Sequence, residues 1–506
     1  MLDMLIAGFL SVLTVETMFL IFVGVFAGII FGSIPGISAT MGVTLFLPLT
    51  YGMEPIGGLA LLCAVYIGGV SGGLISAVLL NIPGTPASIA TTFDGHPMRQ
   101  KGEAGKALGI GIVYSFLGGI FSLIILMLVA PSLARIAVQF GPFEYCAIAL
   151  FSLTMVSGLS SGSLVKGLLA CLLGITAAFA GIAPVSAATR LTFGIPNLVG
   201  GFSTLPVLIG LFALPQIFEL AEKKSRKGNL ASSAEVFTDY NIKGFGFTMK
   251  EFKSQMGNML QSSFIGTAIG ILPGIGGGVS NMFAYGMAQK RSKNPEKFGT
   301  GIIDGIVASE SANNATTGGA LVPLLTLGIP GDSTTAVILA GFTIHNITPG
   351  PNLFNTDGVL VYGIFAALFI ANIFMIIQEF MGLRLFVKLL SIPQHIMLSV
   401  VFIFCVVGTF ALNNSMFDVL SMVIFGVVGY ILQKLAFPLT PIVLGFILGP
   451  LVETNLLRGL GLSDGSFRPF ITEPIAAAFI IFTVLTIAFT TKHEVFKKQK
   501  VVEVSK

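Results

Sequence analysis

The chain has 506 residues, of which 54% are hydrophobic and 10% are charged, and its mean hydropathy is +0.93. A soluble domain carries about 25% charged residues, so this chain cannot cover a surface that faces water, and we expect a multi-pass protein embedded in the lipid bilayer. The net charge of +4 includes no basic patch that indicates nucleic acid. The four cysteines lie in apolar runs without metal-ligand spacing, so we expect no metal and no cofactor. The N-terminus lacks a basic n-region, and we expect no cleaved signal peptide.

The first predicted elements are two apolar stretches, 17–50 and 58–93, each interrupted by a Gly/Pro phrase. Both phrases recur, 238 and 247 residues later, within 255–288 and 300–343. The first reads Phe26-x-Gly28-x-x-x-Gly32-x-x-Pro35-Gly36-Ile37 and then Phe264-x-Gly266-x-x-x-Gly270-x-x-Pro273-Gly274-Ile275; the second reads Ile82-Pro83-Gly84 and then Ile329-Pro330-Gly331. Duplicated halves with matching Gly/Pro interruptions are typical of transporters that bind substrate at the breaks.

The distribution of Lys and Arg predicts the orientation of these stretches. Basic clusters lie at 94–106, 222–254, 289–297 and 492–506, and positive loops face the cytoplasm. Both ends of 255–288 then lie inside, so we expect a re-entrant hairpin there. Its counterpart 17–50 is followed by a loop without Lys or Arg, at 51–55, and should open to the other side. The broken segments 58–93 and 300–343 also end on opposite sides, so the two halves are predicted to be inverted repeats.

The remaining apolar segments complete the predicted topology. They span 107–131, 143–160, 165–183, 197–220, 358–383, 393–412, 415–433, 437–452 and 471–491. We expect an all-α polytopic membrane protein with about 11 full crossings plus two hairpins, an outside N-terminus and a cytoplasmic C-terminus. We assign 1–221 to the first inverted repeat, 222–254 to a cytoplasmic or interfacial connector, 255–491 to the second repeat plus a final helix, and 492–506 to a cytoplasmic tail.

Glycines recur at every fourth residue in both copies of the first phrase. The series are Gly24, Gly28, Gly32 and Gly266, Gly270, Gly274. This spacing gives a smooth helix face and predicts close helix packing, which would also permit sliding between helices.

Several longer phrases resemble one family. These are Gly32-x-x-Pro-Gly-Ile-Ser-Ala-Thr-Met-Gly42, the stretch from Tyr66 to Pro86 that ends in Asn-Ile-Pro-Gly-Thr-Pro, Phe93-Asp-Gly-His-Pro-Met98, Ser311-Ala-Asn-Asn-Ala315, Gly328-Ile-Pro-Gly331 and Thr348-Pro-Gly-Pro351. Together they resemble the large permease subunit of tripartite tricarboxylate transporters over nearly the whole chain. The resemblance implies a permease of the bacterial inner (cytoplasmic) membrane, a small membrane subunit and a periplasmic solute-binding protein as partners, and a small organic carboxylate as substrate. Asp332 and Ser309 depart from the family pattern, in which a small hydroxyl residue and a proline are expected.

Candidate binding residues follow the predicted breaks. None of the four motif stretches contains Lys or Arg, so an anion would have to be held by helix N-termini together with hydroxyl and amide groups. The candidates for substrate binding are Ser38, Thr40, Asn81, Thr85, Ser88, Ser280, Asn281, Asn313, Asn314, Ser333, Thr334 and Thr335. A single Ser or Thr more often bonds its own helix, but clusters after breaks in two copies favour a binding role. For the asparagines, a role in joining helices stays equally open.

Carboxylates in apolar spans are candidates for ion coupling, because charge at membrane depth is costly. Glu310 and Asp332 lie deepest, and either could bind Na⁺ or carry a proton; a structural hydrogen bond for Glu310 stays an alternative. We expect Asp94 and Asp304 to be capping or solvated residues near the interfaces.

The leading hypothesis is therefore a secondary transporter that imports tri- or dicarboxylates by cation-coupled alternating access, with Na⁺ or H⁺ as the coupling ion and no enzyme activity. An intramembrane hydrolase is an alternative, because Ser71 and the serines of 158–162 are flanked by glycine, but it would need a His or Lys base at the same depth. A passive anion channel and a scaffold without transport are further alternatives.

Overall fold

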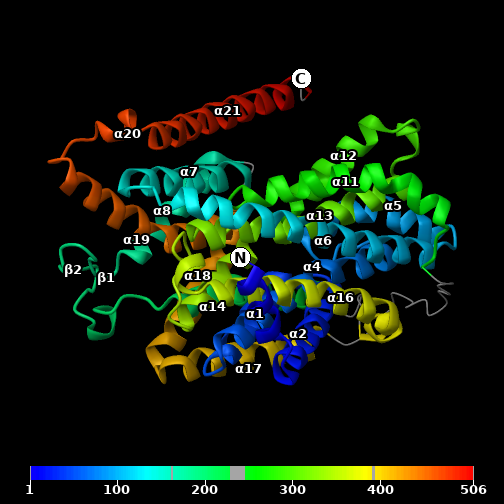
Figure 1. The fold of residues 1–506 in the computed structure, drawn as a ribbon, viewed down its shortest axis with the longest axis horizontal. Coiled ribbons are helices and arrows are strands. Elements are labelled where there is room, and N and C mark those ends of the chain that lie inside the picture. Colours follow the sequence, from blue (N-terminus) through cyan, green and yellow to red (C-terminus); the bar gives the residue numbers. More distant parts are fainter. Residues whose placement is uncertain (1, 161–162, 228–244, 390–393, 505–506) are drawn as a thin grey trace. The chain divides into compact units, whose positions relative to one another are not determined.

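The computed structural model describes residues 2–160, 163–227, 245–389 and 394–504, and these residues are almost wholly helical (Figure 1). Eight stretches are long and apolar enough to cross a membrane: Val15–Ser33, Pro55–Leu80, Ala104–Ala137, Thr204–Glu222, Gly358–Lys388, Met416–Lys434, Leu439–Leu462 and Pro474–Lys492. The predicted spans at 143–160, 165–183 and 393–412 contain shorter apolar helices. A helical multi-pass membrane protein is thereby confirmed, while the number of crossings and the inverted orientation of the halves stay predictions.

The chain divides into two compact units. The first comprises residues 1–134, 216–271 and 276–412. Its elements are α1 (Leu2–Val12), α2 (Val15–Ser33), α3 (Ala39–Phe46), η1 (Leu47–Thr50), α4 (Pro55–Leu80), η2 (Pro86–Ser88), α5 (Ile89–Gln100), most of α6 (Ala104–Ala137) and of α10 (Leu214–Lys227), α11 (Met249–Ile271), α12 (Gly276–Arg291), η4 (Pro295–Lys297), α13 (Ile303–Leu327), α14 (Ser333–Ile344), α15 (Leu353–Thr356), α16 (Gly358–Leu389) and most of α17 (Gln394–Asn413). Both predicted hairpins, apart from the turn 272–275, and both predicted breaks therefore belong to this unit.

The second unit comprises residues 135–215, 272–275 and 413–506. It contains α7 (Pro142–Ser160), α8 (Leu164–Ala178), the strands β1 (Gly181–Ile182) and β2 (Thr189–Arg190), η3 (Pro196–Leu198), α9 (Thr204–Phe212), α18 (Met416–Lys434), α19 (Leu439–Leu462), α20 (Pro469–Thr472) and α21 (Pro474–Val504). The strands pair antiparallel, with Gly181 opposite Arg190. Arg190 donates to both carboxylate oxygens of Glu453 on α19, and this bond raises the pKa of the guanidinium. The ion pair fixes the β-hairpin against α19.

Two equivalent helices form the core of the first unit. Every residue from Gly57 to Leu79 of α4 and every residue from Gly305 to Thr326 of α13 is buried. α4 is apolar enough to be a candidate span, but α13, with its Ser, Asn and Thr side chains, is not among the candidates in the described residues. A helix this polar is stable at membrane depth only when other helices surround it. This polar helix therefore lies inside the unit.

Glycines pack the two halves in the same way. A Cβ on Gly28 or Gly32 of α2 would lie 2.4 Å from Val65 O or 2.1 Å from Gly69 O of α4. At the corresponding positions, a Cβ on Gly266 or Gly270 of α11 would lie 2.2 Å from Ala312 O or 2.6 Å from Thr316 O of α13. The repeated glycines thus mark equivalent close contacts between backbones, as the spacing predicted. Gly274 is an exception, because it lies in the turn after α11.

The hairpins and breaks end where the repeated phrases predict. Gly36 and its counterpart Gly274 both have positive φ, +89° and +78°, in the turns after α2 and α11. α4 ends at Asn81 and α13 at Gly328, and both caps are left-handed, with φ of 56° and 72°. Asparagine and glycine are the residues that adopt this conformation most readily at a helix end. Pro83 and Pro330 follow two residues later and prevent the helices from continuing.

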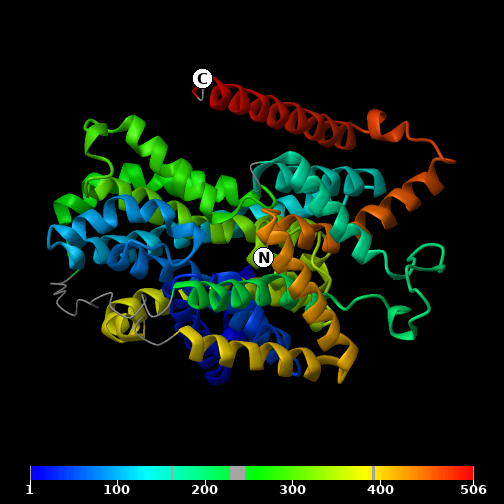
Figure 2. The ribbon, with the colours of Figure 1, turned by 180° about the vertical axis from the view of Figure 1, so that it is seen from behind.

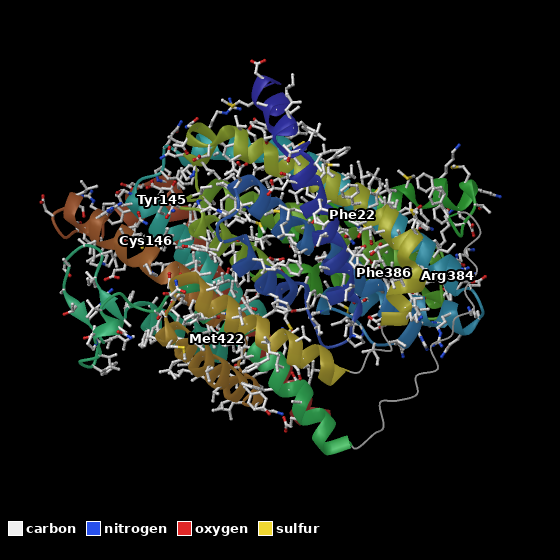
Figure 3. All side chains as sticks on the ribbon, turned by 90° about the horizontal axis from the view of Figure 1, so that it is seen from below. Phe22, Tyr145, Cys146, Arg384, Phe386 and Met422 are labelled. Atoms are coloured by element: carbon white, nitrogen blue, oxygen red, sulfur yellow. The ribbon has the colours of Figure 1, made fainter. Side chains whose placement is uncertain are left out.

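Other helices surround this pair. α11, α12 and α13 pack against one another, as Figure 1 and Figure 2 show from opposite sides. α16 packs on α1, α2 and α4. Aromatic rings fill the contact between α2 and α16: the ring centroids of Phe22 and Phe374 are 5.5 Å apart and those of Phe26 and Phe386 are 5.4 Å apart, and Figure 3 shows Phe22 and Phe386 there.

One predicted loop differs from the structure. The basic segment 94–106 is mostly helical, since α5 continues to Gln100 and α6 begins at Ala104. Asp94, expected to be a capping or solvated residue, is fully buried and accepts hydrogen bonds from the backbone N–H groups of Gly299, Gly301 and Ile302. Asp94 therefore caps the segment that leads into α13. Capping was one of the two roles expected for it. Residues 228–244 of the predicted connector lie outside the described residues.

Candidate functional site

The first hairpin meets the second break. α3 begins after the Pro35-Gly36 turn, and α14 begins after Pro330-Gly331. The Thr40 hydroxyl in the first turn of α3 lies 3.0 Å from Ser333 Oγ and 2.8 Å from Thr334 Oγ1 in the first turn of α14. We call this contact the α3–α14 junction. It brings together three residues that the sequence predicted for the site from opposite halves of the chain.

The second hairpin meets the first break in the corresponding way. Asn281 in the second turn of α12 donates to the carbonyl oxygen of Ala87 in η2. A Cβ on Gly277 would lie 2.8 Å from the Cβ of Ala87, and one on Gly278 would lie 3.3 Å from Pro86 O. We call this contact the α12–η2 junction. Each hairpin is therefore seated on the break of the other half.

Equivalent hydrogen bonds start the helices after both breaks. Asp332 is the N-cap of α14: its Oδ1 accepts from Thr335 N at 2.7 Å, and its own N–H donates to Thr335 Oγ1 at 2.9 Å. At the first break, Thr85 N donates to Ser88 Oγ at 3.3 Å, and Ser88 Oγ donates to Thr85 O at 2.9 Å. A reciprocal cap of this kind satisfies backbone groups that a helix start leaves free. Ser88 and Thr335 therefore use their hydroxyls within the caps.

The two junctions adjoin each other beside α4 and α13. A Cβ on Gly276, the first residue of α12, would lie 3.6 Å from the Cβ of Asp332. Asn313 of α13 donates from Nδ2 to Val70 O of α4 at 3.2 Å, and its Oδ1 would be 3.0 Å from a Cβ on Gly277. Glycines at 276–278 therefore allow the start of α12 to approach Ala87, Asn313 and Asp332 closely.

The junctions differ in how completely their polar groups are bonded. In the α3–α14 junction, Tyr66 of α4 donates to Asp332 Oδ2 at 2.6 Å, so both carboxylate oxygens of Asp332 have donors. In the α12–η2 junction, Thr85 Oγ1, Asn281 Oδ1 and Asn313 Oδ1 are buried, and none has a hydrogen-bond partner within the described residues. Unpartnered buried polar atoms are costly and rare in native proteins. The open bonding capacity is thus concentrated at the α12–η2 junction.

The other predicted site residues take structural positions. Ser38 is the N-cap of α3, accepting from Met41 N, and it is bonded to Gln216 of α10. Ser280 lies 2.7 Å from Thr316 Oγ1 of α13. Asn314 donates to Glu310 O in its own helix. Asn81 is exposed, and its left-handed cap conformation accounts for it.

Glu310 is buried and bonded from two other helices. Thr91 of α5 donates to Oε1, and Ser115 of α6 donates to Oε2 at 2.9 Å. Ser309, the other residue that departs from the family pattern, lies 3.0 Å from Thr91 Oγ1. The expected structural partners were Ser309, Ser311 or an asparagine; Asn313 does interact with the Glu310 carboxylate, and Thr91 and Ser115 add donors from distant elements.

Comparison with known proteins decides the family. The family model "Tripartite tricarboxylate transporter TctA family" matches residues 18–444. The chain belongs to the TctA family. An uncharacterized 52.8 kDa protein in the TAR-I ttuC' 3' region of Agrobacterium vitis is 33% identical over 473 residues, which cover 94% of this chain and 93% of that protein. A second A. vitis protein, uncharacterized and in the TAR-II ttuC' 3' region, is 38% identical over 215 residues, 42% of this chain and 89% of its own length. No solved structure matches the chain.

Membership of the TctA family makes this chain a membrane subunit of a tripartite tricarboxylate transporter, as the sequence motifs indicated. A transporter family is consistent with the expectation of no enzyme activity. Ser71, one serine of the hydrolase alternative, has a buried hydroxyl with no hydrogen-bond partner among the described residues. Ser161 lies outside the described residues.

The sequence analysis missed two buried polar residues of the first unit. Tyr66 was quoted only as the first residue of a motif, and its bond to Asp332 depends on the tertiary contact between α4 and α14. Glu379 of α16 is fully buried, and neither of its carboxylate oxygens has a hydrogen-bond partner in the described part of the chain. A signal for Glu379 existed, since it is an ionisable residue within the predicted apolar span 358–383.

Proposed function

We propose that this TctA-family chain is the large membrane subunit of a binding-protein-dependent secondary transporter of the bacterial inner membrane. It imports small organic carboxylates, tri- or dicarboxylates, by cation-coupled alternating access. A small membrane subunit and a periplasmic solute-binding protein complete the transporter. One observation carries this proposal: each hairpin packs against the helix break of the other half. These contacts bring helix starts and hydroxyl groups together.

The chemistry of the two junctions suits an anionic substrate. Lys and Arg are absent from the four motif stretches that build them. Backbone N–H groups at helix starts and hydroxyl donors bind carboxylates without a strongly hydrated cation. At the start of α14 this capacity is already used by the carboxylate of Asp332. The start of α12 has glycine at 276–278 and the free hydroxyl of Thr85 nearby, and we place the substrate carboxylate there.

The two free amide oxygens define the rest of this site. Asn281 Oδ1 and Asn313 Oδ1 can accept a hydrogen bond only from a donor that arrives with the substrate, or they can contact a cation. Both interactions are available when a hydroxy acid or a partly protonated carboxylate enters with the coupling ion. In this arrangement Asn281 and Asn313 hold the substrate, and Thr85 donates to it. Asp332 repels a bare anion, which favours entry of the anion together with positive charge.

Alternating access follows from the packing of the two halves. Smooth glycine contacts join α2 to α4 and α11 to α13, so each hairpin can shift along its partner helix with little side-chain interlocking. In the proposed cycle, the two inverted halves exchange conformations and open the site to each side in turn. The junctions change together, because each contains one element from each half.

The test is uptake of labelled citrate and succinate by the complete three-component transporter in proteoliposomes. Thr85→Val should weaken uptake about tenfold or more, because it removes a free donor at the site, without reducing the amount of protein inserted. Thr326→Val is the matched control, since the Thr326 hydroxyl is also buried but bonds only Val322 O of its own helix. Ser333→Ala probes the α3–α14 junction in the same assay.

Three outcomes contradict the proposal. Uptake that does not saturate and that persists without the binding protein would indicate a passive channel. The absence of uptake for every carboxylate tried would remove the transport assignment. Equal kinetics for Thr85→Val and Thr326→Val would remove Thr85 from the site.

A further inference from the structure

Glu379 is a buried carboxylate for which the binding site described above has no use. It lies on α16, is 0% exposed, and neither Oε1 nor Oε2 has a hydrogen-bond partner within the described residues. A charged carboxylate without donors in a protein interior costs many kcal/mol, and such a group takes up a proton instead. Glu310, by contrast, has a hydroxyl donor on each oxygen, from Thr91 and Ser115. The two glutamates therefore have opposite surroundings, one suited to the acid and one to the anion.

The two glutamates lie on helices that pack on the same helix. α16, which carries Glu379, and α13, which carries Glu310, both pack on α4, which carries Ser71, and Glu379 interacts electrostatically with Glu310 and with Ser71. Ser71 Oγ is itself buried and has no hydrogen-bond partner in the described chain. It can accept a hydrogen bond from Glu379 when that carboxyl group is protonated. Two buried carboxylates at such a site do not both ionise readily, so they tend to hold one proton between them.

Charged groups on the neighbouring helices are bonded elsewhere or exposed, and on α16 itself Arg384 and Lys388 are exposed. α4 contributes Tyr66, which is bonded to Asp332, and the thiol of Cys63. The carboxylates on α1 and α2, Asp3 and Glu16, are exposed. On α6, which donates Ser115 to Glu310, Lys106 is paired with Glu251. The part of the chain that the structure describes thus places no Lys or Arg ion pair on either glutamate.

The pair is connected to the α12–η2 junction through two short links. Ser71 follows Val70, whose carbonyl oxygen accepts the Asn313 side chain at 3.2 Å. Asn313 lies three residues after Glu310, so the two side chains occupy neighbouring positions on α13. Thr91, a donor to Glu310, lies one turn after Ser88 in the helix that starts at the break. A change of charge at the pair is thus transmitted to both helices that border the junction.

We propose that Glu310 and Glu379 form the coupling site of this transporter and that the coupling ion is a proton, held by Glu379 against Ser71 while Glu310 stays bonded to Thr91 and Ser115. The proton is taken from water on one side and returned to water on the other, and no bond of the substrate changes. This inference rests on the proposed transport function, but the protonation of Glu379 can be tested without transport.

The first test is infrared spectroscopy of the purified full chain in nanodiscs, titrated with pH. Wild type should show a carboxylic acid C=O band at neutral pH, and Glu379→Gln should lose part of its intensity. Glu16→Gln, which changes an exposed glutamate, should lose none of it. Ser71→Ala keeps the acid and should shift the frequency of its band, because it removes the acceptor. A band that is unchanged in Glu379→Gln overturns the proposal.

The second test is citrate uptake by the three-component transporter in proteoliposomes under an imposed pH gradient or an imposed Na⁺ gradient. The pH gradient should stimulate wild type and Glu16→Gln. Glu379→Gln and Glu310→Gln should lose about tenfold or more of that stimulation, as expected when a coupling free energy of typical size is removed. Stimulation by Na⁺ alone, or stimulation by pH that survives in Glu379→Gln, overturns proton coupling. If wild type transports no carboxylate at all, the transport function fails, and the infrared result still decides whether Glu379 holds a proton.

Discussion

Replacing Gly32 by alanine places a methyl group 2.1 Å from the carbonyl oxygen of Gly69. Because that oxygen belongs to the backbone of α4, it cannot rotate away, and α2 must move outward by about 1 Å. Overpacking of a tight core costs about 1–3 kcal/mol. The higher helix propensity of alanine stabilises the protein by up to about 1 kcal/mol. We therefore expect the free energy of unfolding to fall by about 1–2 kcal/mol. At the equivalent Gly270 the nearest oxygen is 2.6 Å away, and the loss should be smaller.

Two less tightly packed glycines serve as controls for these substitutions. Gly42 is buried, but its nearest neighbour, Phe31 Cβ, is 3.2 Å away, and Gly257 of α11 has nothing within 4 Å. Gly42→Ala should be nearly neutral, and Gly257→Ala should gain up to about 1 kcal/mol. The assay is the midpoint of thermal unfolding of the purified full chain, followed by size-exclusion chromatography. The midpoints should fall in the order Gly257→Ala, Gly42→Ala, Gly270→Ala, Gly32→Ala. Midpoints that are equal for Gly32→Ala and Gly257→Ala would refute the packing of α2 on α4.

Three other predictions concern single polar contacts. Thr40→Val should weaken carboxylate uptake more than Thr44→Val, because Thr44 is equally buried but bonds only its own helix; equal uptake would remove the α3–α14 junction from the mechanism. Tyr66→Phe should lower the thermal midpoint by the equivalent of about 1.5–3 kcal/mol, since Asp332 loses a buried donor; an unchanged midpoint would contradict that bond. The pKa of Glu251 is lowered to about 2, first by its bond to a lysine, so its stabilisation is present above the ordinary value of 4.5 and is lost as the pH falls towards 2. Because solvent screens this pair, Glu251→Gln should remove about 1 kcal/mol or less at neutral pH and nothing below pH 2, as measured by unfolding at several pH values.

Local chemistry made the hairpins and breaks predictable. A Pro-Gly pair after a glycine-spaced helix ends that helix in any tertiary setting, so the phrases at Gly36 and Gly274, and at Pro83 and Pro330, located the ends of four helices. Several hydroxyls and amides after these breaks meet at the two junctions, and their binding role stays a prediction. Their division between caps and free groups was not predictable, because Thr85 and Asp332 occupy equivalent caps yet only one of them has a bonding partner from α4.

Contacts between remote segments lay beyond the sequence pattern. Nothing in the repeat indicates that each hairpin is seated on the other half, since a repeat is equally consistent with two self-contained halves. Glu379 illustrates the same limit. Its position in an apolar span marks it as unusual, but its approach to Ser71 and Glu310 follows only from the packing of α16 on α4.

The crosswise seating also sets the order in which the protein can be completed during synthesis. Ser333, the partner of Thr40, lies 293 residues later in the chain. At about 5–20 residues per second, the ribosome needs roughly 15–60 s to supply that partner. During this interval the first hairpin lacks the residues of α14 that it contacts in the finished protein. Until they are made, only the insertion machinery and the surrounding lipid can stabilise it in the membrane. The α3–α14 junction therefore cannot exist on a nascent chain until Ser333 and Thr334 have been synthesised.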